Sequence, residues 1–196
     1  MDVFETVKKR KSVRSYKPIP IPEEFLMKVI EAARMTPSAG NIQPWHFIII
    51  KDEDKRKRIA KGCRYGKFLT ESPIIIVACG NKKTSPHWYA LDTAIALEHL
   101  VLAATDIGLG TCWIGNFNQE DIRKMLRIPK KFEVIALMAL GYPYRKVDIV
   151  ARLLYFIRPR KKINEILSLE NYSEKLAVPF NTESNKVRTS ARALKI

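Results

Sequence analysis

The sequence predicts one domain of mixed α and β structure, and three observations support this fold class. The chain has 196 residues, of which 46% are hydrophobic, so it can bury one substantial core. Short runs of β-branched and aromatic residues predict strands, and longer stretches with apolar residues at helical spacing predict helices. Because the two patterns alternate along the chain, we expect helices packed against a sheet.

The first part of the chain predicts two helices and a loop. Asp2 can cap a first helix that ends near Lys9. Three prolines at every second position make residues 17–22 extended, and Pro22 suits the first turn of a second helix. Residues 36–44 read TPSAGNIQP, a composition that favours turns, so we expect a loop there.

The same two patterns predict the remaining elements. We expect strands at Trp45–Ile50, Ile74–Cys79, Thr111–Ile114 and Phe132–Leu140, the first, second and last of them buried. We expect helices at Asp54–Gly62, at Tyr89–Thr105, from a cap at Asn118 to about Leu126, and at Ile163–Leu169. The longest helix, Tyr89–Thr105, is nearly apolar apart from Asp92, Glu98 and His99, which predicts burial in the core or in an interface.

The composition argues against several classes of protein. The sequence contains no run of about 18 apolar residues, so it predicts no membrane span. The charged residues of Met1–Arg14 leave no hydrophobic export signal, so we expect a cytoplasmic protein. Cys63, Cys79 and Cys112 lack disulfide or zinc spacing, and the scattered histidines predict no metal site. The net charge of +15 favours phosphorylated or polyanionic partners, but no nucleic-acid-binding motif accompanies it.

The segment KKRKSVRSY places basic residues where several of them can contact one anion. Arg10, Ser12 and Arg14 are two positions apart, so in extended chain their side chains point the same way, with Lys11 between them. Guanidinium forks and a serine hydroxyl suit a phosphate monoester or a phosphorylated cofactor. A basic surface run explains this pattern equally well.

Two further segments contain groups that suit a flat heterocycle. In PSAGNIQPW, Gly40 exposes backbone amides, and Ser38, Asn41 and Gln43 supply polar side chains, whose other possible role is to stabilise turns. In GLGTCWIG, a glycine turn leads to residues 113–115 and allows backbone N–H groups to approach a ring closely. Taken alone, this segment indicates an ordinary helix end followed by a buried tryptophan.

In order and spacing, these segments resemble the motifs of the nitroreductase family of FMN-dependent reductases. KKRKSVRSY is similar to its Arg-Arg-Ser-x-Arg motif, PSAGNIQPW to its Pro-Ser-x-x-Asn-x-Gln-Pro-Trp loop, GLGTCWIG to its Gly-Leu-Gly strand, and RKKINEIL to its closing Arg-Lys-x-x-x-Glu-Ile stretch. The resemblance covers Val3 to about Leu167. It implies an α+β nitroreductase-like fold, with helices flanking a central, mostly antiparallel sheet, and a homodimer with FMN at the interface.

The resemblance also implies the residues of the FMN site. The phosphate and ribityl chain would be held by Arg10, Lys11, Ser12, Arg14, Arg160 and Lys161. The flavin ring would be contacted by Asn41, by the backbone of Ile114, Gly115 and Asn116, and by Pro37, Ser38 and Ala39 from the other subunit, with Gln43 setting that loop. Lys11 stands where the family has a second arginine, and therefore lacks the bidentate fork.

This resemblance implies an oxidoreductase in which flavin takes hydride from NADH or NADPH and passes it to a nitroaromatic, a quinone or a similar acceptor by a ping-pong mechanism. We accordingly name no catalytic side chain. Tyr65, Phe68 and Trp88 are candidates to line the substrate slot, although aromatic residues also serve as packing. The alternatives are a specialised family member, such as a reductive dehalogenase or a flavin-processing enzyme, and a non-catalytic FMN-binding or nucleic-acid-associated basic protein.

The predicted FMN-binding domain spans residues 1–170, and residues 171–196 form a C-terminal tail. Apolar residues in the tail, among them Leu176 and Phe180, predict that it wraps a partner subunit to about Phe180. Beyond Asn181 we expect disorder.

Overall fold

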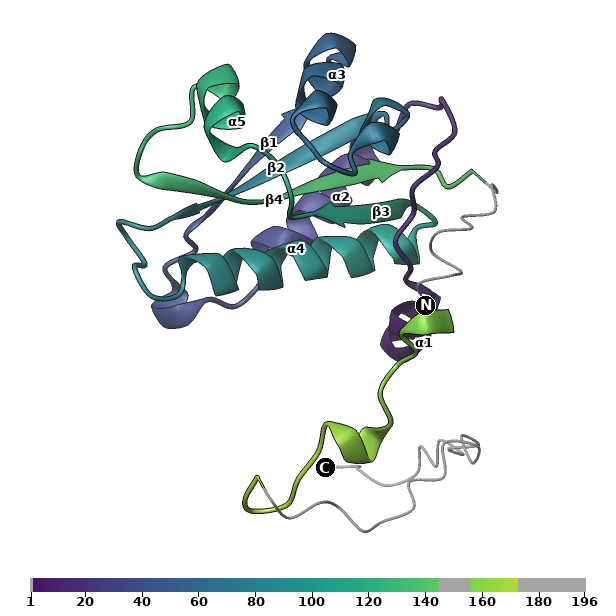
Figure 1. Ribbon diagram of the computed structural model, residues 1–196, viewed down its shortest axis with the longest axis vertical. Coiled ribbons are helices and arrows are strands. Elements are labelled where there is room, and N and C mark those ends of the chain that lie inside the picture. Colours follow the sequence, from purple (N-terminus) through teal and green to yellow (C-terminus); the bar gives the residue numbers. More distant parts are fainter. Residues whose placement is uncertain (1, 145–155, 173–196) are drawn as a thin grey trace, which may run out of the picture. The chain divides into compact units, whose positions relative to one another are not determined.

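The structure is a computed structural model that describes residues 2–144 and 156–172. The described residues fall into two units, one within Met1–Val147 and the other within Asp148–Ile196. All the strands and α-helices named below belong to the first unit (Figure 1). The predicted boundary at residue 170 stays a prediction, and the predictions for the tail from residue 173 onward lie outside the described residues.

A four-stranded antiparallel sheet forms the framework of the first unit (Figure 1). Its strands are β1 (Trp45–Ile50), β2 (Ile74–Asn81), β3 (Gly110–Ile114) and β4 (Phe132–Gly141), in the spatial order β1-β2-β4-β3. The two central strands pair along the length of β2, with Ile76 opposite Met138 and one register shift between Ala78 and Cys79. The four predicted strands and the antiparallel sheet are therefore confirmed.

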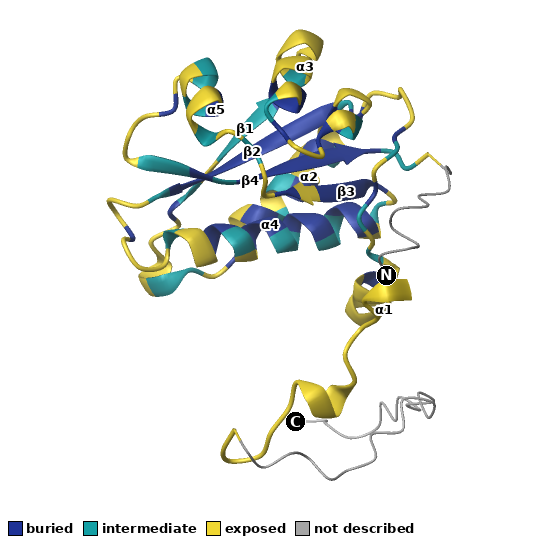
Figure 2. Ribbon diagram, in the orientation of Figure 1, coloured by how far each residue is buried: buried dark blue, intermediate teal, exposed yellow. Residues whose placement is uncertain are grey.

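Helices cover both faces of this sheet. Helices α2 (Glu23–Arg34) and α4 (Tyr89–Asp106) pack on one face, and α3 (Glu53–Lys61) and α5 (Gln119–Leu126) pack on the other. Alternate residues of β2 point to opposite faces, so Ile76 packs with α2 and α4 whereas Val77 packs with α3 and α5. Because both faces are covered, β2 is buried from Ile74 to Gly80, as the dark blue ribbon in Figure 2 shows.

Local signals fix the ends of several helices where the sequence predicted them. Asp2 caps α1 (Val3–Lys9), since its Oδ1 accepts a hydrogen bond from the Phe4 N–H at 2.8 Å. Asn118 caps α5 in the same way. Gly108, with φ +82°, ends α4 in the left-handed conformation that a helix end often requires.

Two of the sequence predictions are wrong. Strand β1 is only partly buried: it is an edge strand that pairs only with β2 among the described strands, and although Ile50 is buried, His46 is exposed and the other four residues are half-buried. The helix predicted at Ile163–Leu169 is a short 3-10 turn, Ile163–Glu165. Residues 163–169 are all exposed, so the apolar side chains of this segment do not provide the packing that stabilises a longer helix.

Candidate functional site

The basic N-terminal segment lies against strand β3, and we call residues Arg10–Tyr16 the arm. Ser12 forms a parallel bridge with Thr111, and the Val13 N–H donates to the Thr111 carbonyl at 2.8 Å. The Tyr16 hydroxyl donates to the Val13 carbonyl at 2.6 Å, and burial raises the pKa of this phenol well above its ordinary value. Two motifs about a hundred residues apart in the sequence are therefore neighbours.

Gly110 permits the close approach of the arm to β3. A Cβ on Gly110 would lie 2.6 Å from Cγ2 of Val13 and 2.9 Å from its Cβ, which is too close for any residue but glycine. Val13 is buried, and neighbouring side chains of an extended segment point to opposite sides. Ser12 and Arg14 therefore lie on the side of the arm away from Val13, where Arg14 is exposed and Ser12 is half-buried.

The loop Pro37–Gln43 folds tightly on itself and contains a 3-10 turn at Ala39–Asn41. Gly40, Asn41 and Gln43 have φ of +56°, +56° and +53°. The left-handed region is unfavourable for most residues with a Cβ, and asparagine tolerates it better than glutamine, so the loop holds strain chiefly at Gln43. The Gln43 N–H donates to Ser38 Oγ at 2.9 Å, and Gln43 Nε2 donates to the Asn41 carbonyl at 3.1 Å. Ser38 and Gln43 therefore stabilise the turn, while Gly40 and Asn41 are exposed.

Helix α4 contacts both the loop and the arm–β3 pair. Asp92 Oδ1 accepts a hydrogen bond from the Ala39 N–H at 3.3 Å. Six residues further along, Glu98 accepts a hydrogen bond from the indole N–H of Trp113 and interacts with the charge of Arg10. Burial raises the pKa of Glu98, and Arg10 and Trp113 oppose that shift. At a rise of 1.5 Å per residue, the two contacts lie about 9 Å apart along the helix.

Sequence reasoning missed Asp92 and Glu98 as site residues. In the sequence they are only polar interruptions of an apolar helix. A carboxylate within such a helix is nonetheless a signal, because acidic side chains are almost never fully buried unless they are paired. The pattern of the helix therefore points to partners for these carboxylates, although it does not identify them.

A shallow hollow opens where the loop meets the start of α4. Its lining residues come from these two segments: Pro37, Ser38, Ala39, Trp88, Leu91, Asp92 and Ile95. Of the three aromatic candidates, Trp88 lines this hollow, whereas Phe68 packs against the core on the α3 side and Tyr65 is exposed beside Arg64. The hollow therefore has apolar walls with one carboxylate among them.

The end of strand β3 exposes backbone. Ile114 is buried and pairs with Leu137, whereas Gly115 and Asn116 are exposed. A Cβ on Gly115 would meet no atom within 4 Å, in contrast to Gly110 in the same motif. Packing among the described residues therefore does not require a glycine at position 115, and a ligand has room to approach the backbone there.

The structure brings together the arm with β3 and the loop with α4, but it does not test every predicted site residue. Arg160 and Lys161 belong to the second unit, where they are exposed and come just before the turn Ile163–Glu165. Their part in binding an anion stays a prediction, as does the contribution of Lys11, which is exposed.

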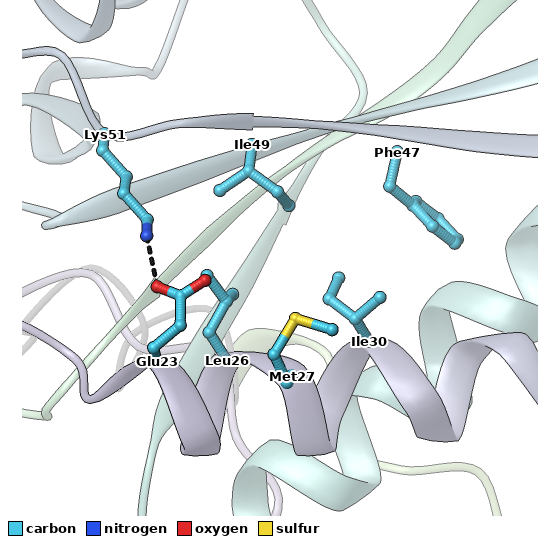
Figure 3. A pocket seen from close by; sticks show the side chains of 7 residues that line it. All are labelled: Glu23, Leu26, Met27, Ile30, Phe47, Ile49 and Lys51. Carbon is cyan, nitrogen blue, oxygen red and sulfur yellow. Dashed lines mark hydrogen bonds and ion pairs between the residues drawn. The ribbon is translucent and has the colours of Figure 1, made fainter.

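A second pocket lies between α2 and β1 (Figure 3). Its lining residues are Glu23, Leu26, Met27, Ile30, Phe47, Ile49 and Lys51. An ion pair between Lys51 Nζ and Glu23 Oε2, 2.6 Å long, spans it. None of the predicted site residues lines this pocket, so we do not assign it to the candidate site.

The described residues contain no cluster of side chains suited to a metal ion. Cys63, Cys79 and Cys112 are buried and form no disulfide with one another, and burial raises the pKa of Cys63 and Cys79 to about 11, which keeps these two thiols protonated and unreactive at neutral pH. Among the helices that the structure describes, none combines the length and the apolar character of a membrane span.

Comparison with known proteins identifies relatives of this arrangement. A model of the family described as the nitroreductase family matches residues 7–64 and 60–142. A protein of Archaeoglobus fulgidus, provisionally named NADH dehydrogenase/NAD(P)H nitroreductase, is 35% identical over 146 residues, which cover 71% of this chain and 84% of that protein.

Two solved structures have the same fold. The crystal structure of a nitroreductase family protein from Clostridium novyi NT has a TM-score of 0.71 and 33% identity, and the match covers 89% of this chain and 97% of that one. An FMN-dependent nitroreductase from Clostridium difficile R20291 has a TM-score of 0.68 and 28% identity, with coverage of 81% and 99%. The predicted α+β nitroreductase-like fold is confirmed. Since the family match spans more than half of the chain and includes the arm, the loop and β3, this chain belongs to the nitroreductase family.

Proposed function

We propose that this enzyme binds FMN and uses NADH or NADPH to reduce an electron-poor small molecule, such as a nitroaromatic or a quinone, by a ping-pong mechanism. The observation that carries the proposal is the pairing of Ser12 with Thr111, which places the basic arm beside the strand that ends in exposed backbone at Gly115. A basic segment suited to a phosphate and a stretch of exposed backbone suited to a flat ring thus lie along one edge of the sheet. The FMN-dependent relative with 28% identity supports the choice of cofactor.

The phosphate end of the cofactor fits the arm. Arg10, Ser12 and Arg14 offer two guanidinium groups and one hydroxyl, a donor set that matches phosphate oxygens. Lys11 adds a point charge, and Arg160 and Lys161 would add further charge from the second unit. Val13 and Tyr16 fix the backbone of the arm in the core, so the backbone that carries these donors is in place before the cofactor binds.

The ring end of the cofactor fits the loop and the end of β3. Asn41 has a side-chain amide that matches the alternating carbonyl and ring-nitrogen groups of a flavin. Ile114, Gly115 and Asn116 offer backbone groups, with open space at Gly115 where a ring can approach. Pro37, Ser38 and Ala39 would contact the flavin from the partner subunit, with Gln43 bracing their loop.

When bound, FMN supplies hydride acceptance from the nicotinamide and hydride transfer to the acceptor. The chain itself has to bind, orient and partly shield the ring. We assign no general acid or nucleophile: Cys63, Cys79 and Cys112 are buried, and Glu98 is engaged by Trp113. The apolar walls around Trp88 would favour a flat, poorly hydrated acceptor.

A homodimer is part of this proposal. Apolar side chains are exposed at helical spacing on two neighbouring helices, namely Val3, Phe4 and Val7 on α1 and Leu91 and Ile95 on α4. Exposed apolar side chains of this kind are typical of an interface between subunits. Light scattering should give twice the mass of the 22.6 kDa chain, and a monomeric protein that still binds FMN would overturn this part of the proposal.

The first experiment is an absorbance spectrum of the purified protein before and after anaerobic NADH or NADPH. We expect flavin bands that bleach on reduction and return when a nitroaromatic or a quinone is added. A colourless protein that FMN cannot reconstitute would contradict the proposed function. A coloured protein that neither nicotinamide reduces would indicate the non-catalytic FMN-binding alternative instead.

A further inference from the structure

We propose that Asp92 is a positioning residue of the FMN site, whose carboxylate holds the strained Pro37–Gln43 loop in the conformation that contacts the cofactor. This inference rests on the proposed function and adds to it a residue outside the segments that resemble family motifs. It follows from three features of the structure: the strain in the loop, the contact between the loop and α4, and the unpaired oxygen of the carboxylate.

The loop does not hold its shape without help from outside. Its internal bonds run from the Asn41 N–H to the Ser38 carbonyl at 2.9 Å and from the Gln43 N–H to Ser38 Oγ at 2.9 Å. These bonds close the turn on itself. The two ends of the segment have their own anchors, since Thr36 Oγ1 lies 2.9 Å from His99 Nδ1 and the Asn81 N–H donates to the Pro44 carbonyl at 2.8 Å, but the internal bonds do not fix the middle of the loop against α4. Left-handed backbone at non-glycine residues persists only where the surroundings enforce it. An external anchor is therefore required.

Asp92 provides that anchor. Ala39 begins the 3-10 turn, where a backbone N–H has no partner within the turn, and this N–H donates to Asp92 Oδ1 at 3.3 Å. Asp92 itself is 4% exposed, and its own N–H is bonded to the Trp88 carbonyl at 2.8 Å within α4. The acceptor thus stands on a rigid helix, while the donor stands on the strained loop.

The second oxygen of Asp92 contributes no hydrogen bond to the stability of the fold among the described residues. Asp92 Oδ2 is buried and has no hydrogen-bond partner among the described residues. Its neighbours around the hollow include Pro37, Leu91 and Ile95, which are apolar. A buried carboxylate with one unpaired oxygen lowers the stability of a fold. Selection for stability alone would favour an apolar residue here, such as Leu100 further along the same helix.

The test compares full-length Asp92→Ala, Asp92→Asn and Thr93→Val proteins. The Asn variant keeps an oxygen that can accept from the Ala39 N–H. Thr93→Val is the matched control, because Thr93 is fully buried on the same helix and its Oγ1 donates to the Tyr89 carbonyl at 2.6 Å, away from the loop. FMN affinity is measured by titration of the apoprotein, and hydrogen exchange of the Ala39 amide is measured by NMR without FMN.

We expect Asp92→Ala to weaken FMN binding about tenfold or more and to speed exchange of the Ala39 amide by a similar factor, as loss of one charge-assisted hydrogen bond implies. Asp92→Asn should stay within about threefold of the wild type in both measurements. Thr93→Val should leave both unchanged. The apoprotein of Asp92→Ala should unfold at the same temperature as the wild type or higher, since the substitution removes the unpaired oxygen.

Ala39→Pro tests the same hydrogen bond from the loop side, which keeps the proposal testable if Asp92→Ala does not fold. Proline lacks the N–H and suits the first position of a helical turn, and Ser38 before it is already extended, at φ −142° and ψ 158°. Ala39→Pro alone should weaken FMN binding about tenfold or more, because it removes the same hydrogen bond, and wild-type affinity in this variant would contradict the inference. Where both variants fold, adding Asp92→Ala to Ala39→Pro should weaken FMN binding by less than about threefold further.

Wild-type affinity for FMN and wild-type exchange at Ala39 in Asp92→Ala would overturn the inference. Equal losses in Asp92→Ala and Thr93→Val would also overturn it, because they would indicate general damage to α4. The two failures can be told apart. If the wild type does not bind FMN, the proposed function is wrong. If the wild type and Asp92→Ala bind FMN equally well, only the role of Asp92 is wrong.

Discussion

The arm and the loop present polar groups to the same proposed site, but they are held in place by different means. Backbone hydrogen bonds to β3 and the buried side chains of Val13 and Tyr16 fix the arm. The loop is exposed from Gly40 to Gln43, has strained backbone, and depends on a few side-chain bonds. Changes at the base of the arm should therefore alter folding first, whereas changes in the loop should alter ligand binding first.

The largest expected effect concerns the contact between the arm and β3. Gly110→Ala should lower the free energy of unfolding by about 2–3 kcal/mol, because the new Cβ would lie 2.6 Å from Val13 Cγ2 and overpack the core. Denaturant unfolding measures this change. Val13→Ala in the same protein should restore part of the stability, and Gly115→Ala is the matched control that should leave it unchanged. Equal stability of Gly110→Ala and the wild type would contradict the described packing of the arm.

The exposed side of the arm should behave like the loop instead. Arg14→Gln should weaken FMN binding roughly tenfold to a hundredfold, the range for loss of a charged hydrogen bond, and should change the free energy of unfolding by less than about 0.5 kcal/mol. Titration of the apoprotein with FMN and denaturant unfolding measure the two quantities. Arg58→Gln on α3 removes an equal charge from an exposed site outside the arm and should change neither. Equal losses of affinity in both variants would indicate general attraction by the basic surface rather than a phosphate site.

In the loop, Gln43→Gly should separate stability from binding. Glycine relieves the left-handed strain at φ +53° but removes the side-chain bonds to Asn41, so the free energy of unfolding should stay within about 0.5 kcal/mol of the wild type. FMN affinity should fall several-fold, because the loop becomes less rigid. If this variant were as unstable as Gly110→Ala, the contrast between arm and loop would be broken.

The sequence alone predicted most of the fold because its strongest signals are local. The apolar run of β2 predicts a strand buried on both faces, and Asp2 and Asn118 predict helix starts through their own side chains. The edge position of β1 was not predictable from such local signals, because an apolar run does not show whether a strand pairs with one other strand or with two. The exposed segment 163–169 has helical spacing of apolar residues without a surface to bury them against.

The site was only partly predictable for a related reason. The arm and the loop have distinctive residues, but the bond between Ala39 and Asp92 joins positions 53 residues apart, and neither segment identifies the other as its partner. Glycines look alike in sequence, yet Gly110 is required by Val13 and Gly115 faces open space. Long-range contacts of this kind depend on the packed structure, so residues that position other residues are the ones that sequence reasoning misses.

The smallest expected effect concerns Glu98, which lies close to the arm through Arg10 and to β3 through Trp113. Burial raises its pKa above the ordinary value of 4.5. As pH rises, the carboxyl therefore ionises in the unfolded chain before it ionises in the folded protein. The stability that the protonated carboxyl gives the folded state at low pH is then lost. Glutamine has no such titration. The free energy of unfolding of Glu98→Gln minus that of the wild type should therefore increase between pH 4 and pH 7.

A second glutamate gives this pH experiment its control. Lys57 holds the pKa of Glu53 below its ordinary value, through a hydrogen bond and through its charge, so the contribution of Glu53 to stability is present at neutral pH and lost as pH falls through the folded-state pKa. The stability difference for Glu53→Gln should thus change with pH in the opposite direction, and by a small amount, because this pair is exposed. Denaturant unfolding at several pH values measures both differences. If the stability difference changed with pH in the same direction in both variants, the charge of Arg10 would outweigh the effect of burial on the pKa of Glu98. The arm would then be linked to α4 more by this charge than by the burial of the Glu98 carboxyl.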